Sequence, residues 1–275
     1  MDSAETMKKI RGIEIKTNKL VDEVFSGEYK SGFRGKGIEF DNIRQYEPGD
    51  DARVIDWNVT ARYNKAFVKQ YIEEREMNMY LLIDMSRSNS FGGKKDLIAE
   101  ISATLAFSAI KNNDRVGAIF YTEKIEKHIP SKNGRKHVLR IIDNILNFEP
   151  EQSGTDIAGA LRYFNRVEKK RGVVFLISDF LDAGYENDLT ATDSRHDLIR
   201  VRVADKAEER IPAGAIFTFK DLESGETYVM DNTRSDFAVS PVSDISNKNL
   251  ITIYTDEDYV KPLKQFFYRR GRRRR

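Results

Sequence analysis

Five side chains in this sequence combine the residue types and the spacing of a site for a hard metal ion. They are Asp84, Ser86 and Ser88, which follow the apolar run of MYLLI, Thr155 in the segment Gly154-Thr155-Asp156, and Asp179, which follows GVVFLI. Alternate positions in an extended segment point to the same side, so the first three can converge. Carboxylate and hydroxyl oxygens suit Mg²⁺ or Mn²⁺ and do not suit Zn²⁺. The pattern therefore predicts a magnesium or manganese site.

Simpler roles for the same residues remain as alternatives. Asp and Ser cap helices routinely, and Thr155 and Asp156 stand directly before the helical pattern of DIAGALRYF. Asp179 could be an ordinary loop residue at a strand end. Asp84 could also be the nucleophile of a metal-dependent phosphoryl-transfer enzyme. Aspartyl-phosphate phosphatases, however, place a second aspartate two positions later, where this chain has Ser86.

From residue 79 onward, apolar strand-like runs alternate with amphipathic helical segments. The expected strands are MYLLID, RVGAIFYT, KIEKHIP, GVVFLISD, DLIRVRVAD and NLITIYT, and the expected helices are KKDLIAEISATLAFSAIKNN, RKHVLRIIDNIL, DIAGALRYFNRVEKK and DEDYVKPLKQFFYRR. This alternation predicts an α/β fold, with a mostly parallel sheet and helices on both faces. Ligands of such sheets bind at the carboxyl ends of the strands, near the point where strand order reverses. The polar motifs follow such ends or open the next helix.

The N-terminal part of the chain has a different character. Residues 3–26 show apolar residues at helical spacing and predict a helix. Residues 27–75 contain several glycines and the turn signal Pro48-Gly49, between short β-prone pieces. We therefore expect residues 1–75 to form a helix followed by a β-rich extension.

Residues 76–270 are expected to form the α/β domain. Near 212–237 the sequence reads as an antiparallel hairpin, an insertion on the main sheet. Residues 271–275 are expected to be a disordered arginine tail, because Gly271 interrupts the final helix and the end has no apolar side chain to bury.

Composition excludes several classes of protein. The 275 residues include no cysteine and three histidines, which excludes disulfide scaffolds and thiolate sites and leaves little material for a histidine-rich metal site. No stretch approaches the roughly 18 apolar residues of a membrane helix, and the start of the chain has no apolar signal region. These features predict a soluble, cytoplasmic protein without a transmembrane segment.

The charge of the chain is unevenly distributed. The net charge is +2, but the final seven residues carry six arginines, which leaves −4 for residues 1–268. A mildly acidic body does not predict specific nucleic-acid binding. The arginine end could contact RNA, anionic lipid or an acidic protein surface, or it could simply be a solubilising end.

The motif D-x-S-x-S, followed by a loop threonine and a distant aspartate, resembles the metal-ion-dependent adhesion site of the von Willebrand factor A domain. Asp84, Ser86, Ser88, Thr155 and Asp179 match that site. The resemblance implies a Rossmann-type sheet with an Mg²⁺ or Mn²⁺ ion. In that family the hydroxyls ligate the ion, the aspartates act directly or through water, and one position stays open for a carboxylate of a partner.

The segment GEYKSGFRGKGIEFDNIRQYEPGDDARVIDWNVTAR resembles the signature of the family catalogued as domain of unknown function 58. The matching positions are Gly35, Gly37, Glu39, Phe40, Arg44, Tyr46, Gly49, Asp50, Arg53, Asp56, Trp57, Ala61 and Arg62. The resemblance covers roughly residues 27–260. Some relatives carry membrane helices before this region, and this chain resembles the soluble type.

The signature also has a structural interpretation. Its aspartates, Asp50, Asp51 and Asp56, can pair with Arg44, Arg53 and Arg62, and Trp57 is expected to anchor the segment on the sheet. Such a network could join the extension to the domain, or it could form a docking surface for a partner.

The two resemblances together imply a metal-dependent protein-interaction module. They imply a MoxR-type AAA+ ATPase as partner, with which the protein acts like a chaperone in the maturation or assembly of protein complexes. A client would offer a carboxylate to the metal. The chain contains no GxxxxGK[ST] phosphate loop and is not expected to be an enzyme. Phosphoryl transfer by Asp84 is the second hypothesis, and binding of RNA or membrane through the arginine end is the third.

Overall fold

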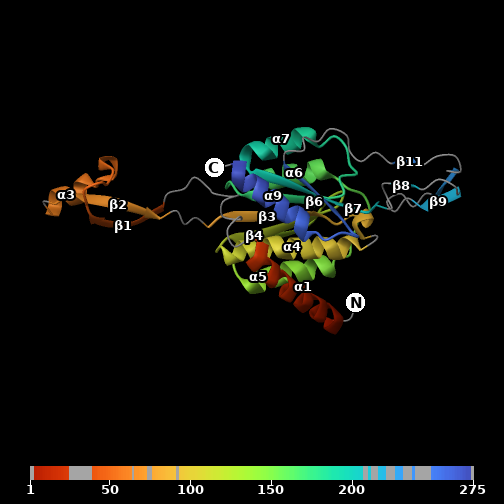
Figure 1. Ribbon diagram of the computed structural model, residues 1–275. Helices are drawn as coiled ribbons and strands as arrows, with labels where there is room; N and C mark the ends of the chain where they lie inside the picture. The colour runs from red at the N-terminus through yellow and green to blue at the C-terminus, as the bar shows by residue number, and fades with distance from the viewer. Residues whose placement is uncertain are drawn as a thin grey trace. The chain divides into compact units, whose positions relative to one another are not determined.

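The computed structural model describes residues 3–24, 39–63, 65–72, 76–90, 93–206, 210–211, 216–220, 227–231, 237–238 and 249–273 (Figure 1). The chain divides into two compact units, of which the smaller comprises residues 34–76. The larger unit contains the α/β sheet and the candidate metal site.

A six-stranded sheet forms the centre of the larger unit. Its strands are β3 (Asn78–Asp84), β4 (Arg115–Tyr121), β5 (Ile125–Lys132), β6 (Val173–Ser178), β7 (Asp197–Ala204) and β12 (Leu250–Tyr254). All neighbouring pairs are parallel except β4 and β5, which are antiparallel. The prediction of an α/β fold with a mostly parallel sheet is confirmed.

The order of the strands reverses its direction in the middle of this sheet. The order is β12-β7-β6-β3-β4-β5, so the chain starts with β3, builds outward through β4 and β5, and then returns to the other side of β3 with β6. This is the doubly wound order, in which ligands bind where the winding direction reverses. The reversal lies between β3 and β6, whose carboxyl ends carry Asp84 and Ser178-Asp179.

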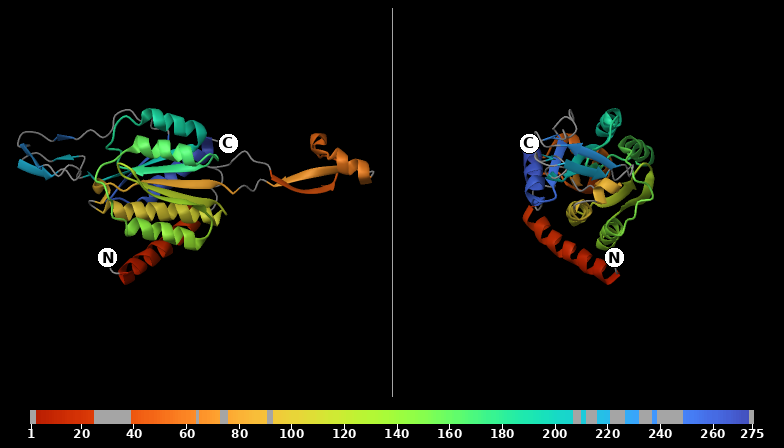
Figure 2. Two further views of the ribbon diagram at one scale, coloured as in Figure 1. Left: turned by 180° about the vertical axis from the view of Figure 1, so that it is seen from behind. Right: turned by 90° about the vertical axis from the view of Figure 1, so that its right-hand side faces the viewer.

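Helices cover both faces of the sheet (Figure 2). The helices α4 (Lys94–Lys111), α5 (Arg135–Leu146) and α9 (Val260–Arg273) pack on one face, and α6 (Ile157–Val167) and α7 (Glu186–Arg195) pack on the other. Successive side chains of strand β3 point alternately to the two faces of the sheet and pack in both cores. Met79, Leu81 and Ile83 join the first core, whereas Tyr80 and Leu82 join the second.

The N-terminal helix belongs to the α/β unit, so the expected division at residue 75 is wrong for it. Helix α1 (Ser3–Val24) packs on α4 and α5, and its Ile10, Ile13 and Val21 complete the apolar core there. Glu14 of α1 accepts two hydrogen bonds from the guanidinium of Arg135 in α5. The apolar spacing predicted the helix correctly, but it could not show which surface the helix would cover.

The smaller unit contains an antiparallel pair, β1 (Glu39–Gln45) and β2 (Phe67–Ile72), with helix α3 (Trp57–Tyr63) between them. The β-rich character was expected, but the helix was not. Trp57 is 69% exposed. The signature glycines at 35 and 37 lie outside the described residues.

Two of the three expected ion pairs form within the smaller unit. The Arg44 guanidinium donates two hydrogen bonds of 2.7 Å to the carboxylate of Asp50, and Arg53 pairs with Asp51. Asp56 instead accepts hydrogen bonds from the backbone N–H groups of residues 58 and 59 at the start of α3, and it lies 3.4 Å from Lys69. Asp56 is therefore a helix cap rather than a partner of Arg62.

The expected hairpin near 212–237 is present. Strands β9 (Ile216–Lys220) and β10 (Thr227–Asp231) pair antiparallel, and the short strands β8 (Arg210–Ile211) and β11 (Phe237–Ala238) form a second antiparallel pair. The residues that join these two strands, 221–226, lie outside the described residues.

The closing helix is longer than the sequence indicated. Helix α9 continues to Arg273, and Gly271 within it is buried, so the expected disordered tail is wrong for residues 271–273. Arg270 pairs with Asp197 at the start of β7 and lies 3.4 Å from the side-chain oxygen of Asn249. Packing and this ion pair outweigh the low helix propensity of one glycine. Residues 274–275 lie outside the described residues.

The ion pair of Arg270 should stabilise the end of α9. In Arg270→Ala the carboxylate of Asp197, whose side chain is 15% exposed, would lose its ion pair with the guanidinium of Arg270. Removing one member of a buried pair costs about 3–5 kcal/mol, and the residual exposure reduces the expected loss to about 2 kcal/mol. Urea unfolding should show this loss, whereas Arg272→Ala, an exposed position in the same helix, should change stability little. Equal stability of the two variants would contradict the role assigned to Arg270.

Candidate metal site

Asp84, the last residue of β3, has a buried carboxylate in which both oxygens accept hydrogen bonds. Oδ1 accepts from the backbone N–H of Ser86 at 3.0 Å, and Oδ2 accepts from the Ser178 hydroxyl at 2.7 Å. Asp84 has no solvent exposure. Each carboxylate oxygen has a second lone pair, so these two bonds orient the group without using its full capacity to bind a cation.

The two serines that follow Asp84 bring their hydroxyls together. Ser86 is buried and Ser88 is half-buried in the short 3₁₀ helix η2 (Arg87–Ser90), and their Oγ atoms lie 3.0 Å apart. Asn89, which the motif did not indicate, lies beside them, with its side-chain nitrogen 3.5 Å from the Ser86 Oγ. Ser86 therefore contacts both Asp84 and Ser88, and the turn at η2 replaces a straight extended segment.

The end of the neighbouring strand β6 supplies the second carboxylate. Ser178, besides donating to Asp84, accepts a hydrogen bond of 2.9 Å from the backbone N–H of Phe180. Asp179 is buried, and its Oδ1 accepts from the backbone N–H of Leu181 at 3.2 Å. Phe180 has a φ of 59°, an uncommon conformation for a bulky residue. The Asp179 carboxylate lies close enough to Asp84 to interact with it electrostatically.

A buried lysine completes this part of the site. Lys94, the first residue of α4, has no solvent exposure, and its Nζ donates to Asp179 Oδ2 at 3.4 Å. Sequence reasoning did not identify it. The only signal was a lysine at the first position of a helix, where the helix dipole disfavours a cation.

Thr155 lies in a loop that is held beside the serines. The backbone N–H of Arg87 donates to the carbonyl of Ser153 at 3.3 Å, which joins this loop to η2. Gly154 packs so closely on Glu123 that a Cβ atom there would lie 2.7 Å from its carboxylate. Among the described residues, no hydrogen bond joins the half-buried Thr155 side chain to the other four predicted ligands.

Asp156, the neighbour of Thr155, is a helix cap. Its Oδ1 accepts a hydrogen bond of 2.7 Å from the backbone N–H of Gly159, and it starts α6. The capping role considered for this pair is therefore confirmed for Asp156.

Burial and a like charge make the ionised form of Asp84 costly. The loss of solvation raises the pKa of Asp84 to about 6, and the nearby Asp179 carboxylate contributes to the same shift. The hydrogen bonds from Ser86 and Ser178 act in the opposite direction. A bound divalent cation would offset this cost, because it favours the charged form.

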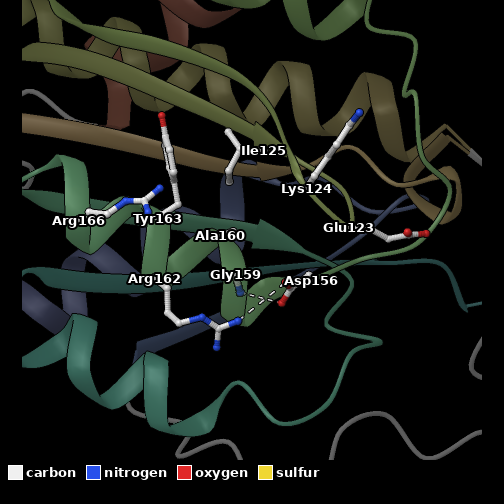
Figure 3. A pocket seen from close by; sticks show the side chains of 9 residues that line it. All are labelled: Glu123, Lys124, Ile125, Asp156, Gly159, Ala160, Arg162, Tyr163 and Arg166. Carbon is white, nitrogen blue, oxygen red and sulfur yellow. Dashed lines mark hydrogen bonds and ion pairs between the residues drawn. The ribbon is translucent and has the colours of Figure 1, made fainter.

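A cavity of about 430 Å³ borders the loop that carries Thr155 (Figure 3). Glu123 and Asp156 line the end nearest that loop, and Lys124, Arg162 and Arg166 contribute cationic side chains. Its lining is mixed in charge and also includes the apolar surface of Ile125, Ala160 and Tyr163. It lies beside the candidate metal site rather than within it.

The donor set fits a hard divalent cation. The described residues contain no group of three or more His, Cys, Asp and Glu side chains that could hold a metal ion, so a site here depends on serine hydroxyls and water besides carboxylates. Such a set suits Mg²⁺, which takes one or two carboxylates and keeps several waters. The side-chain oxygen of Asn89 is buried and has no hydrogen-bond partner among the described residues, which agrees with a position for an ordered water.

The sheet order, with carboxylates at its reversal point, defines a doubly wound α/β protein. The family model described as "Protein of unknown function DUF58" matches residues 42–243. The chain therefore belongs to the DUF58 family, as its N-terminal signature predicted.

The curated relatives carry no functional description. "Uncharacterized protein Rv1480" of Mycobacterium tuberculosis is 29% identical over 99% of this chain and 92% of its own length. "Uncharacterized protein YeaD" of Bacillus subtilis is 28% identical over 38% of this chain and 25% of its own length.

The solved structures that are similar to this chain share little sequence with it. The conserved hypothetical protein BatB from Bacteroides thetaiotaomicron aligns with a TM-score of 0.45 and 11% identity, over 71% of this chain and 99% of that protein. Proximal thread matrix protein 1 from the mussel byssus, whose structure is described as having a zinc-occupied MIDAS motif, aligns with a TM-score of 0.39 and 15% identity, over 48% of this chain and 39% of that one. At these scores, neither likeness carries an inference about the site.

Within the described part of the chain, no helix is both long enough and apolar enough to cross a membrane.

The buried charge of Asp84 should destabilise the metal-free protein at neutral pH. The folded-state pKa of Asp84 is about 6, above the usual value of 3.8. The free energy of unfolding therefore falls as the pH rises from about 4 to about 6, and above about 6 the full cost of the buried charge is present. Asp84→Asn removes the charge and keeps an acceptor for the Ser86 N–H. In excess EDTA at pH 7.5 it should be more stable than the parent by about 1–2 kcal/mol, part of the roughly 3 kcal/mol that a two-unit shift represents.

This gain should shrink as the pH is lowered to 5, because the parent then protonates Asp84. Asp156→Asn is the matched control, since asparagine caps a helix about as well as aspartate and stability should change little. Thermal unfolding at several pH values measures both effects. A lower melting temperature for Asp84→Asn at pH 7.5 would contradict the assigned cost of the buried charge.

Proposed function

We propose that this protein is a metal-dependent protein-interaction module, in which Asp84, Ser86, Ser88, Thr155 and Asp179 hold Mg²⁺ or Mn²⁺. The observation that carries the proposal is that Ser86 contacts both Asp84 and Ser88 at the reversal point of the sheet, where the Asp179 carboxylate also interacts with Asp84. Most residues in this part of the sheet are apolar, so a buried group of oxygens there requires an explanation. Cation binding supplies one.

The spacing of the serine hydroxyls supports the proposal. Adjacent oxygen ligands of octahedral Mg²⁺, with bonds of about 2.1 Å, lie about 3 Å apart. Ser86 Oγ and Ser88 Oγ are 3.0 Å apart. The same separation serves a hydrogen bond when no ion is bound, so the pair can hold an ion without a large rearrangement.

The proposed partner of the bound ion is a carboxylate from another protein. Two serine hydroxyls, a loop threonine and one or two aspartates do not exclude water from every position, and an aspartate or glutamate of a client could replace a water. The mixed-charge cavity beside the Thr155 loop offers polar contacts for the neighbouring residues of that client.

We further propose a MoxR-type AAA+ ATPase as the partner that supplies ATP hydrolysis, and a cytoplasmic location for the pair. The support is membership of the DUF58 family and the resemblance of the metal site to an adhesion site. Co-purification of the tagged chain with such an ATPase, lost in Asp84→Asn and kept in Ser131→Ala, tests whether the metal site contributes to the partnership.

Phosphoryl transfer remains the alternative function. Asp84 is at the end of a parallel strand, as a nucleophilic aspartate would be, but its carboxylate is fully buried and Ser86 stands where a second aspartate would act as acid and base. These two features favour the interaction module.

Metal binding should depend on Asp84 and should be separable from folding. Calorimetry should show millimolar-range Mg²⁺ or Mn²⁺ uptake by the parent, weakened by at least about tenfold in Asp84→Asn, because even outer partners of metal ligands contribute about 10–100-fold. Ser86→Ala should also weaken uptake. Ser131→Ala, a hydroxyl near the far end of the sheet, should bind like the parent. Equal uptake by all four proteins would exclude this site.

The purified protein should hydrolyse neither ATP nor simple phosphate esters above a buffer blank. The chain has no phosphate-binding GxxxxGK[ST] loop and no paired aspartate after Asp84. A turnover that disappears in Asp84→Asn but persists in Asp156→Asn would support the enzyme instead.

A further inference from the structure

Lys94 occupies a costly position for a lysine. It is the first residue of α4, where the positive end of the helix dipole repels a cation, and its side chain has no solvent exposure. Burial also removes the hydration of the ammonium group. Helix stability therefore does not explain a lysine here, and a negative group must offset these costs.

Asp179 is the group that offsets them. Its Oδ2 accepts from the Lys94 Nζ at 3.4 Å, and its own side chain is 4% exposed. Gly93 precedes Lys94 as the N-cap of the helix. Its φ of 82° is the left-handed conformation that glycine adopts readily. The ammonium group thus contacts one of the carboxylates assigned to the metal.

With Lys94 included, the site is electrically neutral when both a divalent ion and a partner carboxylate are bound. Two ionised aspartates and one lysine give a net charge of −1, and a divalent ion would change it to +1. A carboxylate from a partner would then bring the site to neutrality. Without the lysine, the ion alone would neutralise the site, and a partner carboxylate would leave it negative.

We infer that Lys94 is a built-in counter-cation of the metal site: it neutralises Asp179 when no divalent ion is bound, and it weakens divalent binding by repulsion. The inference rests on the proposed function for its second half and on the observed ion pair for its first half. Its consequence is a site that holds the ion loosely until an acidic partner adds the missing negative charge.

Mn²⁺ titration of two lysine variants tests the repulsion. Lys94→Met keeps the length of the side chain without its charge and should bind Mn²⁺ at least about tenfold more tightly than the parent, because the nearest like charge is gone. Lys95→Met removes the same charge one residue later, from a side chain that bonds the carbonyl of Phe148, and should bind within about twofold of the parent. Unchanged or weaker binding by Lys94→Met overturns the inference.

A double-mutant cycle in excess EDTA tests the ion pair without any metal. Lys94→Met removes the ammonium group beside Asp179, Asp179→Asn removes the carboxylate beside Lys94, and the double variant removes both charges. The unfolding equilibrium constant of Lys94→Met should exceed that of the double variant by at least about tenfold. Simple additivity of the two single effects overturns the counter-cation role.

The two experiments separate this inference from the proposed function. One outcome is non-additive effects of Lys94→Met and Asp179→Asn on stability in EDTA, with no Mn²⁺ uptake by any variant. This outcome would retain the ion pair but reject the metal site and the repulsion. Mn²⁺ uptake without coupling would retain the metal site and reject the inference. If Lys94→Met folds only when Mn²⁺ is present, the ion has replaced the lysine charge, which supports the inference. Failure to fold even with Mn²⁺ contradicts it.

Discussion

The parallel pairing of β3 and β6 is the constraint on which the site depends. Because these strands run in the same direction, their carboxyl ends meet at one edge of the sheet and bring Asp84 and Asp179 together. Two buried carboxylates repel each other, and burial alone already raises the pKa of Asp84. The surrounding groups respond to this cost: Ser178 and two backbone N–H groups donate hydrogen bonds, and Lys94 supplies a positive charge.

The helices on the two faces of the sheet restrict polar groups to its edge. Cores on both faces fill the interior of the sheet with apolar side chains, so polar groups can be placed only at the strand ends. Helix α4 contributes to both regions, since its apolar residues pack on the sheet while its first residue, Lys94, contacts Asp179. A change at this helix start therefore affects the electrostatics of the site more than the packing of the core.

The smaller unit, which carries most of the DUF58 signature, has a different physical basis. Its described strands and helix α3 are held by short-range ion pairs and a helix cap rather than by a large core, and Trp57 is exposed. These ion pairs and the helix cap hold the backbone of the smaller unit in one local conformation. An exposed tryptophan on such a surface is typical of contacts with other molecules. The metal site and the signature thus lie in separate parts of the chain. Buried oxygens at strand ends characterise the first, and local ion pairs characterise the second.

The sequence by itself determined the α/β class, the six strands of the main sheet and four of its helices, because apolar periodicity reports burial directly. It also indicated Asp84, Ser86, Ser88 and Asp179, since strand ends with hard oxygens are recognisable from local order. It did not reveal α7, whose ten residues bury only Leu189 and Thr192 and so lack an apolar stripe. Tertiary structure decided that α1 joins the α/β unit, that α9 continues through Gly271, and that Lys94 meets Asp179. Each of these outcomes depends on contacts between segments far apart in the chain, and local spacing carries no information about such contacts.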